Sequence, residues 1–413
     1  MARQEKGILL HYGNISHTIN KIMPFSGIDG EKFLRIVVAP DSYKGSASAL
    51  VVAQAMERGI RRVFPTAEVC KMPIADGGEG TVEALVTATG GQFQQTQVTG
   101  PLGQPVAASW GILGDGQTAI IEMAAASGLP LLTPEQRDPR LTTTFGTGEL
   151  IRAALDAGSR KIILGIGGSA TNDGGVGMAQ ALGIRFTGDD GAELPHGGAA
   201  LARLRRIHLE GLDPRLRETE ITVACDVDNP LCGPRGASAV FGPQKGATPE
   251  MVAELDAALA HFAAVATAAT GRQAAEQPGA GAAGGLGAAM LFFTPAQLRP
   301  GVEIVLDAVH FAEVVKKASF VITGEGRTDF QTAFGKAPVG VAKVAKQFKV
   351  PVFCLSGALG DGTDTLLSHG IDALLGICDQ PMTLEQAMRE GETLIEAAAA
   401  RLCRIIRAVR SLR

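Results

Sequence analysis

The 413-residue sequence has no excess of positive charge and few aromatic rings. Lysine and arginine number 38 against 42 aspartates and glutamates, which gives a formal net charge of −4. Proteins that bind nucleic acid concentrate positive charge against the phosphates, and this balance supplies none. One tryptophan and two tyrosines leave little surface for stacking on bases. We therefore predict that the chain does not bind nucleic acid.

Paired cysteines, a long apolar run and a signal peptide are also missing. The six cysteines are scattered without a C-x-x-C pair, which argues against a zinc site or a disulfide framework. We expect no run of about 18–20 apolar residues that could span a bilayer. Residues 1–33 are too polar for the apolar segment of a signal peptide and are predicted to form an extension outside the fold. These absences predict a cytoplasmic protein with reduced thiols and no membrane partner.

Two common catalytic signatures do not occur. The seven histidines are dispersed and none lies in a glycine-rich segment, which disfavours a histidine-dependent triad or a histidine metal cage. No G-x-x-x-x-G-K-[ST] motif is present, since Gly335-Lys336 is followed by alanine and lacks the upstream glycine. Acid–base chemistry would therefore fall to carboxylates.

Glycine, by contrast, is abundant. The chain has 53 glycines, almost twice the roughly 7% of average proteins. Hydrophobic residues make up 46%, enough apolar mass for a large core. The length suggests two or three domains at roughly 100–200 residues each.

The apolar pattern predicts an α/β fold with a parallel, doubly wound sheet and an inserted second domain. Buried strands followed by glycine-rich turns and helices open the chain from Phe33 onward, and the same rhythm returns after residue 319. Between them, residues 93–123 alternate like antiparallel strands. We predict a discontinuous domain of residues 34–94 and 290–413, and an inserted α/β domain of residues 95–289.

Six glycine-rich segments follow or lie near predicted strand ends. Ligands of open α/β sheets bind beyond the carboxyl ends of strands, where glycine lets backbone N–H groups approach an anion. These segments also carry acids, lysines and an arginine, the mixture that a polyanion with a divalent cation requires. The six segments are Asp41–Gly45, Asp76–Gly80, Gly165–Gly175, Phe241–Gly246, Gly279–Gly287 and Thr323–Asp329.

Two other readings of these loops remain open. Gly165-x-Gly167-x-x-Ala170 matches a dinucleotide fingerprint, with Asp189 near the position of a ribose-binding acid, so an NAD(P)-linked hydroxy-acid dehydrogenase is one alternative. Against it, Gly174, Gly175 and Gly177 would lie inside the helix that must follow, at about 1 kcal/mol each relative to alanine. The other is a non-catalytic nucleotide or metabolite sensor.

Taken in order, the segments resemble the glycerate kinase type-1 family. The resemblance runs from about Leu34 to near the C-terminus. Its motifs are Ala39–Gly45, Ala75–Gly80, Thr99–Gly103, Ile120–Gly128, Gly165–Gly175, Ala224–Val227, Phe241–Gly246, Gly279–Gly287 and Thr323–Arg327. It implies ATP-dependent phosphorylation of D-glycerate to 2-phosphoglycerate, with a flavodoxin-like domain, an inserted α/β domain and an active site in the cleft between them. A homo-oligomer is left open.

The expected reaction assigns a role to each candidate for binding glycerate. Arg327 would bind the glycerate carboxylate through two N–H groups and Lys44 would act as a point charge. Asp41, Ser42 and Asn172 complete the predicted substrate site.

The attacking hydroxyl must lose its proton, which suits a carboxylate base. Asp173 is the first candidate for the base, and Asp76 and Asp226 are equal rivals, as base or as ligands of Mg²⁺.

The nucleotide has its own predicted residues. Gly167, Gly168 and Ser169 would give amides and a hydroxyl to phosphate oxygens, and Lys245 would neutralise the γ-phosphoryl group. Glu325 completes the predicted cofactor site, with ATP and Mg²⁺ as the expected cofactors.

Overall fold

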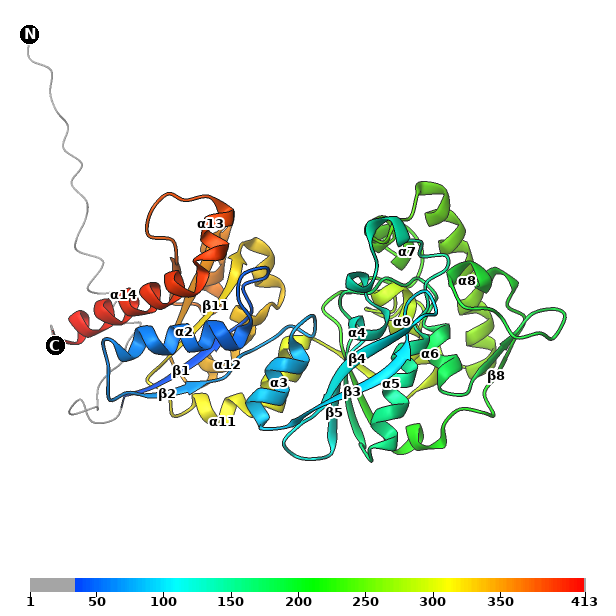
Figure 1. Cartoon of the computed structure of the whole chain (residues 1–413), viewed down its shortest axis with the longest axis horizontal. Helices are drawn as coiled ribbons and strands as arrows, with labels where there is room; N and C mark the ends of the chain where they lie inside the picture. Colours follow the sequence, from blue (N-terminus) through cyan, green and yellow to red (C-terminus); the bar gives the residue numbers. More distant parts are fainter. Residues whose placement is uncertain (1–33, 412–413) are drawn as a thin grey trace, which may run out of the picture.

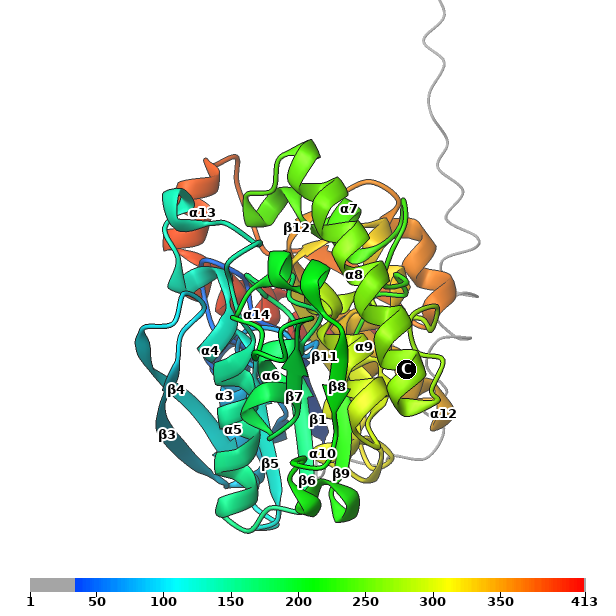
Figure 2. The same cartoon turned by 90° about the vertical axis from the view of Figure 1, so that its right-hand side faces the viewer.

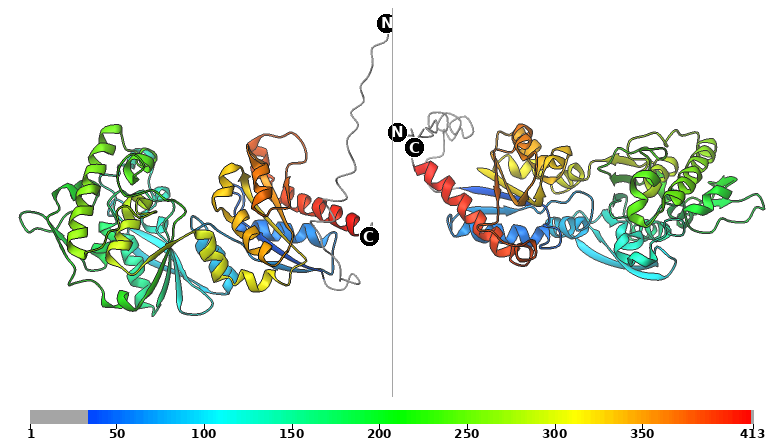
Figure 3. Two further views of the ribbon diagram at one scale, coloured as in Figure 1. Left: turned by 180° about the vertical axis from the view of Figure 1, so that it is seen from behind. Right: turned by 90° about the horizontal axis from the view of Figure 1, so that it is seen from above.

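The computed structural model describes residues 34–411, so the predicted extension at residues 1–33 lies outside the described residues. The chain begins in one lobe, passes through a second lobe and returns to finish in the first (Figure 1). Views from behind and from above show the same two lobes, joined by a narrow region (Figure 3). The excursion into a second lobe agrees with a domain inserted into a discontinuous one.

The described residues form strands, α-helices and short 3₁₀-helices. The strands are β1 Arg35–Pro40, β2 Glu68–Lys71, β3 Gln92–Thr99, β4 Pro105–Ile112, β5 Thr118–Glu122, β6 Lys161–Gly165, β7 Arg185–Thr187, β8 Arg206–His208, β9 Glu220–Ala224, β10 Gln297–Arg299, β11 Phe320–Thr328, β12 Val352–Leu359 and β13 Ala373–Gly376. The α-helices are α2 Ala49–Arg61, α3 Thr81–Thr89, α4 Ala124–Ser127, α5 Phe145–Asp156, α6 Val176–Ala181, α7 Ala237–Phe241, α8 Pro249–Thr270, α9 Ala282–Phe293, α10 Gly301–Ala308, α11 Phe311–Val315, α12 Ala337–Gln347, α13 Leu384–Arg389 and α14 Gly391–Ser411. The 3₁₀-helices are η2 Leu129–Leu131, η3 Pro134–Gln136, η4 Gly198–Arg203, η5 Pro214–Glu218, η6 Pro243–Lys245, η7 Phe330–Phe334 and η8 Thr363–His369.

The first lobe is built on a five-stranded parallel sheet in the order β13-β12-β11-β1-β2. Numbered along the chain within this sheet, the order is 2-1-3-4-5, that of flavodoxin-like folds. Successive strand side chains alternate between its faces, so Ile36 and Val38 pack with α2 and α14, while Val37 and Ala39 pack with α12. Helices on both faces bury the central strand β1 almost entirely, as a parallel sheet requires, while the edge strands β2 and β13 stay partly exposed. The predicted doubly wound sheet is confirmed.

The second lobe contains a six-stranded mixed sheet in the order β10-β9-β6-β5-β4-β3. Strands β3, β4 and β5 pair antiparallel, as the alternating pattern predicted, and β5, β6, β9 and β10 pair in parallel. Figure 2 looks at this lobe from its outer side, where α5 and α8 lie in front of the sheet. The sheet spans residues 92–299, so β10 lies beyond residue 289, where we predict that the inserted domain ends.

The two sheets share one apolar cluster. Val82, Leu85 and Val86 of α3 and Ile304 of α10 are buried together with Ile120 and Ile163 of the second sheet and Val37 and Val321 of the first. Helices α3 and α10 therefore belong to an apolar core that both lobes share, and they hold the two lobes together.

Helix α8 corrects one expectation from the sequence. Among residues 34–411 it is the one helix long and apolar enough, by length and composition, to cross a bilayer. Thr248 caps it, accepting a hydrogen bond from Met251 N at 3.3 Å, and Pro249 follows at the first helical position, where proline is favoured. Leu255, Leu259 and Phe262 are fully buried in the core of the second lobe, so the apolar face has a partner within the fold.

Candidate functional site

Loops from both lobes line a cleft of about 410 Å³. They follow the carboxyl ends of three strands: residues 76–79 after β2, residues 166–169 after β6 and residues 224–227 after β9. Lys44, Leu129, Phe241, Gln244, Ala282 and Ala283 complete the lining. The carboxyl ends of parallel strands from both sheets thus face one space, the position where open α/β sheets bind ligands.

Glycine allows the loops of the two lobes to approach each other closely. A Cβ on Gly165 would lie 2.4 Å from the carbonyl oxygen of Gly77, and one on Gly167 would lie 3.2 Å from Gly78 Cα. Larger residues would push these backbones apart. The predicted glycine-rich loops therefore meet across the cleft, with the backbones of Gly167 and Gly168 exposed toward it.

The Gly167–Ser169 loop is held from behind by the segment after α4. Leu129 N donates to the Gly168 carbonyl at 2.9 Å, and Ala170 N donates to the Ser127 carbonyl at 2.9 Å. Fixed on that side, the loop presents its free backbone groups to the cleft. It can therefore offer preorganised donors to an anion.

Asp76 and Asp226, both predicted site residues, lie on facing loops of the cleft. Asp76 Oδ1 accepts a hydrogen bond from Gly78 N at 3.1 Å, and Asp226 Oδ1 accepts one from Gly301 N at 2.8 Å. Desolvation by the cleft walls, together with the smaller effect of the charge of Asp76, raises the pKa of Asp226 to about 6. A carboxylate with this pKa can take a proton near neutral pH.

A second group of predicted residues lies where β1 and β11 end, at the topological switch point of the first sheet. Asp41 is buried and accepts a hydrogen bond from Ser42 N at 2.6 Å. Burial, and secondly the charge of Asp76, raise the pKa of Asp41 to about 7. Asp76 therefore interacts electrostatically with Asp41 on one side and with Asp226 on the other, which links this group to the cleft.

On β11, Glu325 and Arg327 point into different environments. Glu325 is buried and accepts hydrogen bonds from the hydroxyls of Thr328 at 3.1 Å and Thr332 at 2.6 Å, and burial raises its pKa. Arg327 is exposed, and its Nε lies 3.2 Å from Asp329 Oδ2. Arg327 is thus paired with Asp329 through Nε, while its exposed terminal nitrogens can still meet an anion in solution, and Glu325 organises the loop around it.

Asp173 does not reach into the cleft, which corrects the prediction drawn from its glycine neighbours. It is fully buried, and its Oδ2 accepts hydrogen bonds from Thr144 N and Thr144 Oγ1, both at 2.8 Å, and from Gly177 N at 3.2 Å. Its Oδ1 accepts from Gly175 N at 3.1 Å. With four donors around it, the carboxylate joins the start of α5 to the start of α6. No proton of a substrate can reach it in this arrangement.

Lys245 and Asn172 are likewise behind the cleft wall. The Lys245 ammonium is buried and donates to the Thr171 carbonyl oxygen at 2.7 Å, and Asn172 Nδ2 donates to Ser238 Oγ at 2.9 Å. Burial lowers the pKa of Lys245 to about 7, although the charge of Asp173 opposes this shift. Neither side chain lines the cleft, and both contacts join the Gly165–Gly175 segment to the segment of residues 238–245.

Sequence reasoning missed several cleft residues. Glu79, Phe241 and Gln244 lie in segments that the sequence singled out for glycine, but their side chains were not chosen. Ala283 is a further case: it has a φ of 53°, followed by Gly284 at 67° and Gly285 at 95°. Only the flanking glycines of Gly279–Gly287 hinted at this left-handed turn beside the cleft.

Within residues 34–411, no group of three or more His, Cys, Asp or Glu side chains is placed to hold a metal ion. The six cysteines are free, which agrees with the predicted absence of disulfides.

The chain was compared with known proteins. The model of the "Glycerate kinase family" matches residues 36–407. The chain is 54% identical to a glycerate kinase of Haemophilus influenzae, over 90% of this chain and 99% of the relative. It is 53% identical to glycerate 2-kinase of Escherichia coli, over 86% and 93%. A crystal structure described as glycerate kinase 2 from Salmonella typhimurium superposes with a TM-score of 0.84 at 51% identity, covering 92% of this chain and 99% of that one.

Proposed function

Because the chain belongs to the glycerate kinase family, we propose that it transfers the γ-phosphoryl group of ATP to the 2-hydroxyl of D-glycerate and releases 2-phosphoglycerate. The observation that carries the proposal is the cleft, where the carboxyl ends of parallel strands from both sheets face each other with carboxylates, a lysine and a glycine-rich loop. The name of the Escherichia coli relative supports the 2-position.

In this proposal the first lobe binds glycerate at the switch point. Arg327 is exposed there and offers a planar pair of donors to the substrate carboxylate. Lys44, which is exposed at the cleft, adds a second positive charge. Asp41 and Ser42 at the end of β1 bind the hydroxyls, since an acid with a pKa of about 7 is both donor and acceptor at neutral pH.

Asp76 and Asp226 are the two cleft carboxylates proposed to assist the phosphoryl transfer. The hydroxyl of glycerate must give up a proton as its oxygen bonds to phosphorus, and a carboxylate within the cleft can accept it. Asp226, with a pKa of about 6, is better matched to this task at neutral pH than a carboxylate in bulk water would be. Asp173 holds α5 and α6 in place and takes no part in the transfer.

The second lobe binds the phosphates. The exposed amides of Gly167 and Gly168 and the Ser169 hydroxyl donate to phosphate oxygens, while Lys245 supports the loop through Thr171. Mg²⁺ in kinases binds one or two carboxylates together with phosphates and water. Asp76 fits this requirement while Asp226 acts as the base, and the ion would neutralise charge on the transferring group. Free thiols and dependence on ATP agree with a cytoplasmic location.

The test is a coupled assay of ADP release with D-glycerate, L-glycerate and other hydroxy acids, followed by phosphorus NMR of the product. We expect turnover with D-glycerate and ATP, a signal of 2-phosphoglycerate, and loss of activity with EDTA that excess Mg²⁺ restores. A product phosphorylated at the 3-position would contradict the assigned hydroxyl, and activity undiminished by EDTA would contradict the metal.

Matched variants test the assigned base. We expect Asp76→Asn and Asp226→Asn each to lower kcat by about 10²–10⁴-fold, the usual contribution of a general base or metal ligand. The exposed Asp361→Asn serves as the control and should retain wild-type turnover. Near wild-type turnover in both cleft variants would reject the carboxylate chemistry.

The dehydrogenase alternative has little structural support. The Gly165 loop does not lead directly into a helix, since α6 begins only at Val176 and Gly174 and Gly175 adopt left-handed conformations before it. Asp189 is exposed and pairs with Arg205. Absorbance at the nicotinamide wavelength with glycerate and NAD⁺, in the absence of ATP, should stay unchanged. A sensor would bind ATP without forming ADP.

A further inference from the structure

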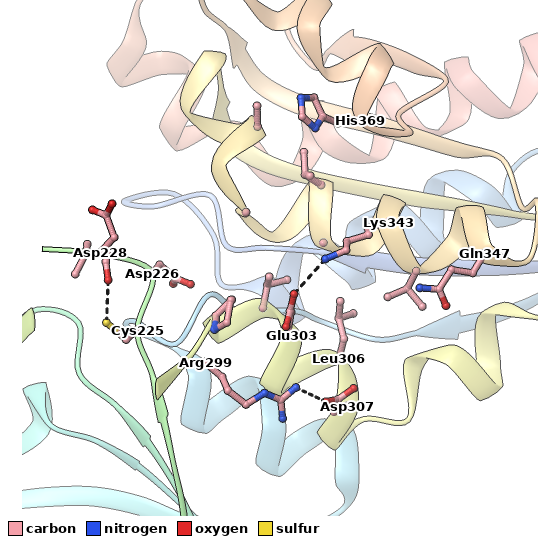
Figure 4. Close-up of a pocket in the computed structure, with 18 of the residues that line it drawn as sticks. Cys225, Asp226, Asp228, Arg299, Glu303, Leu306, Asp307, Lys343, Gln347 and His369 are labelled. Atoms are coloured by element: carbon pink, nitrogen blue, oxygen red, sulfur yellow. Dashed lines mark hydrogen bonds and ion pairs between the residues drawn. The ribbon is translucent and has the colours of Figure 1, made fainter. Parts of the chain in front are cut away.

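A second, larger cavity adjoins the cleft. It has a volume of about 890 Å³ and lies between α10, α12 and the loop that follows β9 (Figure 4). We call it the α10–α12 groove. Its volume falls within the range of roughly 300–1,000 Å³ that sites for drug-sized ligands occupy, and it greatly exceeds what a three-carbon acid needs.

The groove is continuous with the candidate active site. Cys225, Asp226 and Val227 line both the groove and the cleft. A ligand that lies in the groove can therefore extend past Asp226 toward the Gly167–Ser169 loop. Glycerate alone cannot span both spaces, whereas a nucleoside triphosphate has the length and the two chemically different ends to do so.

The walls of the groove suit the uncharged end of such a ligand. Val302 and Leu306 of α10 and Val339 and Val344 of α12 give it an apolar lining. Gln347 also lines the groove, and among the described residues its side-chain amide has no hydrogen-bond partner. A flat heterocycle needs this combination of apolar faces and a polar group at its edge.

Apart from Asp226, the carboxylates, lysine and arginine that line the groove are already in ion pairs. Arg299 Nη2 lies 2.6 Å from Asp307 Oδ2, and Lys343 Nζ lies 3.3 Å from Glu303 Oε1, both visible in Figure 4. Asp228 pairs with Arg235 at 3.0 Å. The groove therefore offers no unpaired cation to phosphates, which instead find Lys44 and the glycine-rich loop in the cleft. Its electrostatics favour a neutral group.

We propose that the α10–α12 groove binds the base and ribose of ATP, with the triphosphate passing Asp226 into the cleft. The inference rests on the proposed kinase function and adds to it the location of the nucleoside. Both lobes then contact the nucleotide, the first through α10 and α12 and the second through the loops after β6 and β9.

The test fills the groove without touching the cleft. Val344→Trp places a large ring in the groove, and Val314→Trp on α11 is the matched control, since both valines are half-buried and pack against the same apolar cluster. We expect Val344→Trp to raise KM for ATP at least 10-fold, with KM for glycerate and kcat at saturating ATP within about threefold of wild type. The control should change none of them.

A phosphate-only probe separates the nucleoside from the triphosphate. Inorganic tripolyphosphate should inhibit wild type and Val344→Trp equally, because it lacks the part that the groove binds. If Val344→Trp folds poorly by thermal unfolding, Gln347→Trp at an exposed position of the same helix replaces it, with the same expected rise in KM for ATP. An unchanged KM for ATP in the folded variant would overturn the proposal.

Calorimetric titration with ADP distinguishes failure of the groove from failure of the function. Weaker ADP binding by Val344→Trp supports the groove even if wild type phosphorylates no glycerate. Conversely, equal ADP affinity in wild type and Val344→Trp rejects the groove while leaving any measured glycerate kinase activity intact.

Discussion

The Lys245 ammonium lies 2.7 Å from the main-chain carbonyl oxygen of Thr171, in a fully buried position. This contact joins two segments 74 residues apart and supports the loop that bears Gly167–Ser169. Burying this ammonium group costs free energy of folding, because burial favours the neutral amine and lowers the pKa of Lys245 to about 7.

Lys245→Met should change how stability depends on pH. Lysine in an unfolded chain has a pKa near 10.4, so between pH 7 and about 10 Lys245 binds more protons in the unfolded state than in the folded state. The folded wild type therefore gains stability as the pH rises through this range. Methionine lacks this titration. We expect the free energy of unfolding of wild type, relative to Lys245→Met, to increase from pH 6.5 to 9.5 in urea titrations. Lys316→Met, at an exposed position, should show no such trend. A difference between wild type and Lys245→Met that stays constant from pH 6.5 to 9.5 would contradict the prediction.

Asp173→Asn should destabilise the fold. The amide replaces one acceptor oxygen with a donor that faces the buried groups of Thr144, Gly175 and Gly177. We expect a loss of about 2–4 kcal/mol in the free energy of unfolding, because buried donors lose their partner. Asp115→Asn, in an exposed turn with similar hydrogen bonds, should lose about 1 kcal/mol or less. Unchanged stability together with a 10²-fold or greater loss of kcat would instead identify Asp173 as catalytic.

Asp41→Asn should stabilise the protein while weakening substrate binding. The folded pKa of Asp41, about 7, exceeds the unfolded value near 3.9, so its ionisation removes stability as pH rises from 4 to 7. Asparagine keeps an acceptor for Ser42 N and cannot ionise. We expect the free energy of unfolding of Asp41→Asn to exceed that of wild type by an amount that grows across this pH range to about 1–3 kcal/mol at pH 8. We also expect a higher KM for glycerate. If this stability difference has already reached its full value at pH 4, the raised pKa assigned to Asp41 is refuted.

Arg327→Lys should raise KM for glycerate about 10-fold, since a lysine cannot form the paired N–H contacts that guanidinium makes with a carboxylate. KM for ATP should stay the same, because the proposed nucleotide site lies elsewhere. Steady-state kinetics with each substrate varied in turn provide the measurement. Arg205→Lys, at an exposed ion pair in the second lobe, is the control. An unchanged KM for glycerate would remove Arg327 from the substrate site.

The sequence predicted the arrangement of the fold because its signals are local. The apolar runs at β1 and β11 and the alternating pattern of β3, β4 and β5 each depend on neighbouring residues, and all appear where expected. The capping box of Thr383 and Gln386 predicts a single final helix, and this prediction is wrong in one respect. The helix breaks at Glu390 into α13 and α14, and α14 packs along α2.

The candidate site was predicted less completely, because burial of a side chain depends on partners far along the chain. Asp76 and Asp173 both follow strands and both have glycine neighbours, yet one lines the cleft and the other is enclosed. What separates them is the distant Thr144, whose N–H and hydroxyl both donate to Asp173. The α10–α12 groove could not be predicted for the same reason, since its walls come from residues 225–229, 299–307 and 333–347 and from His369.

The pairing of β1 with β11 also constrains how the chain can be made. Arg35 N donates to Ser319 Oγ across 284 residues, and β1 lies between β2 and β11 in the sheet. During synthesis, β1 and β2 leave the ribosome long before their central partner, while residues 92–299 already contain every strand of the second sheet. The inserted segment can therefore fold first, and a chain that stops before residue 320 leaves β1 with an open edge that other chains can pair with.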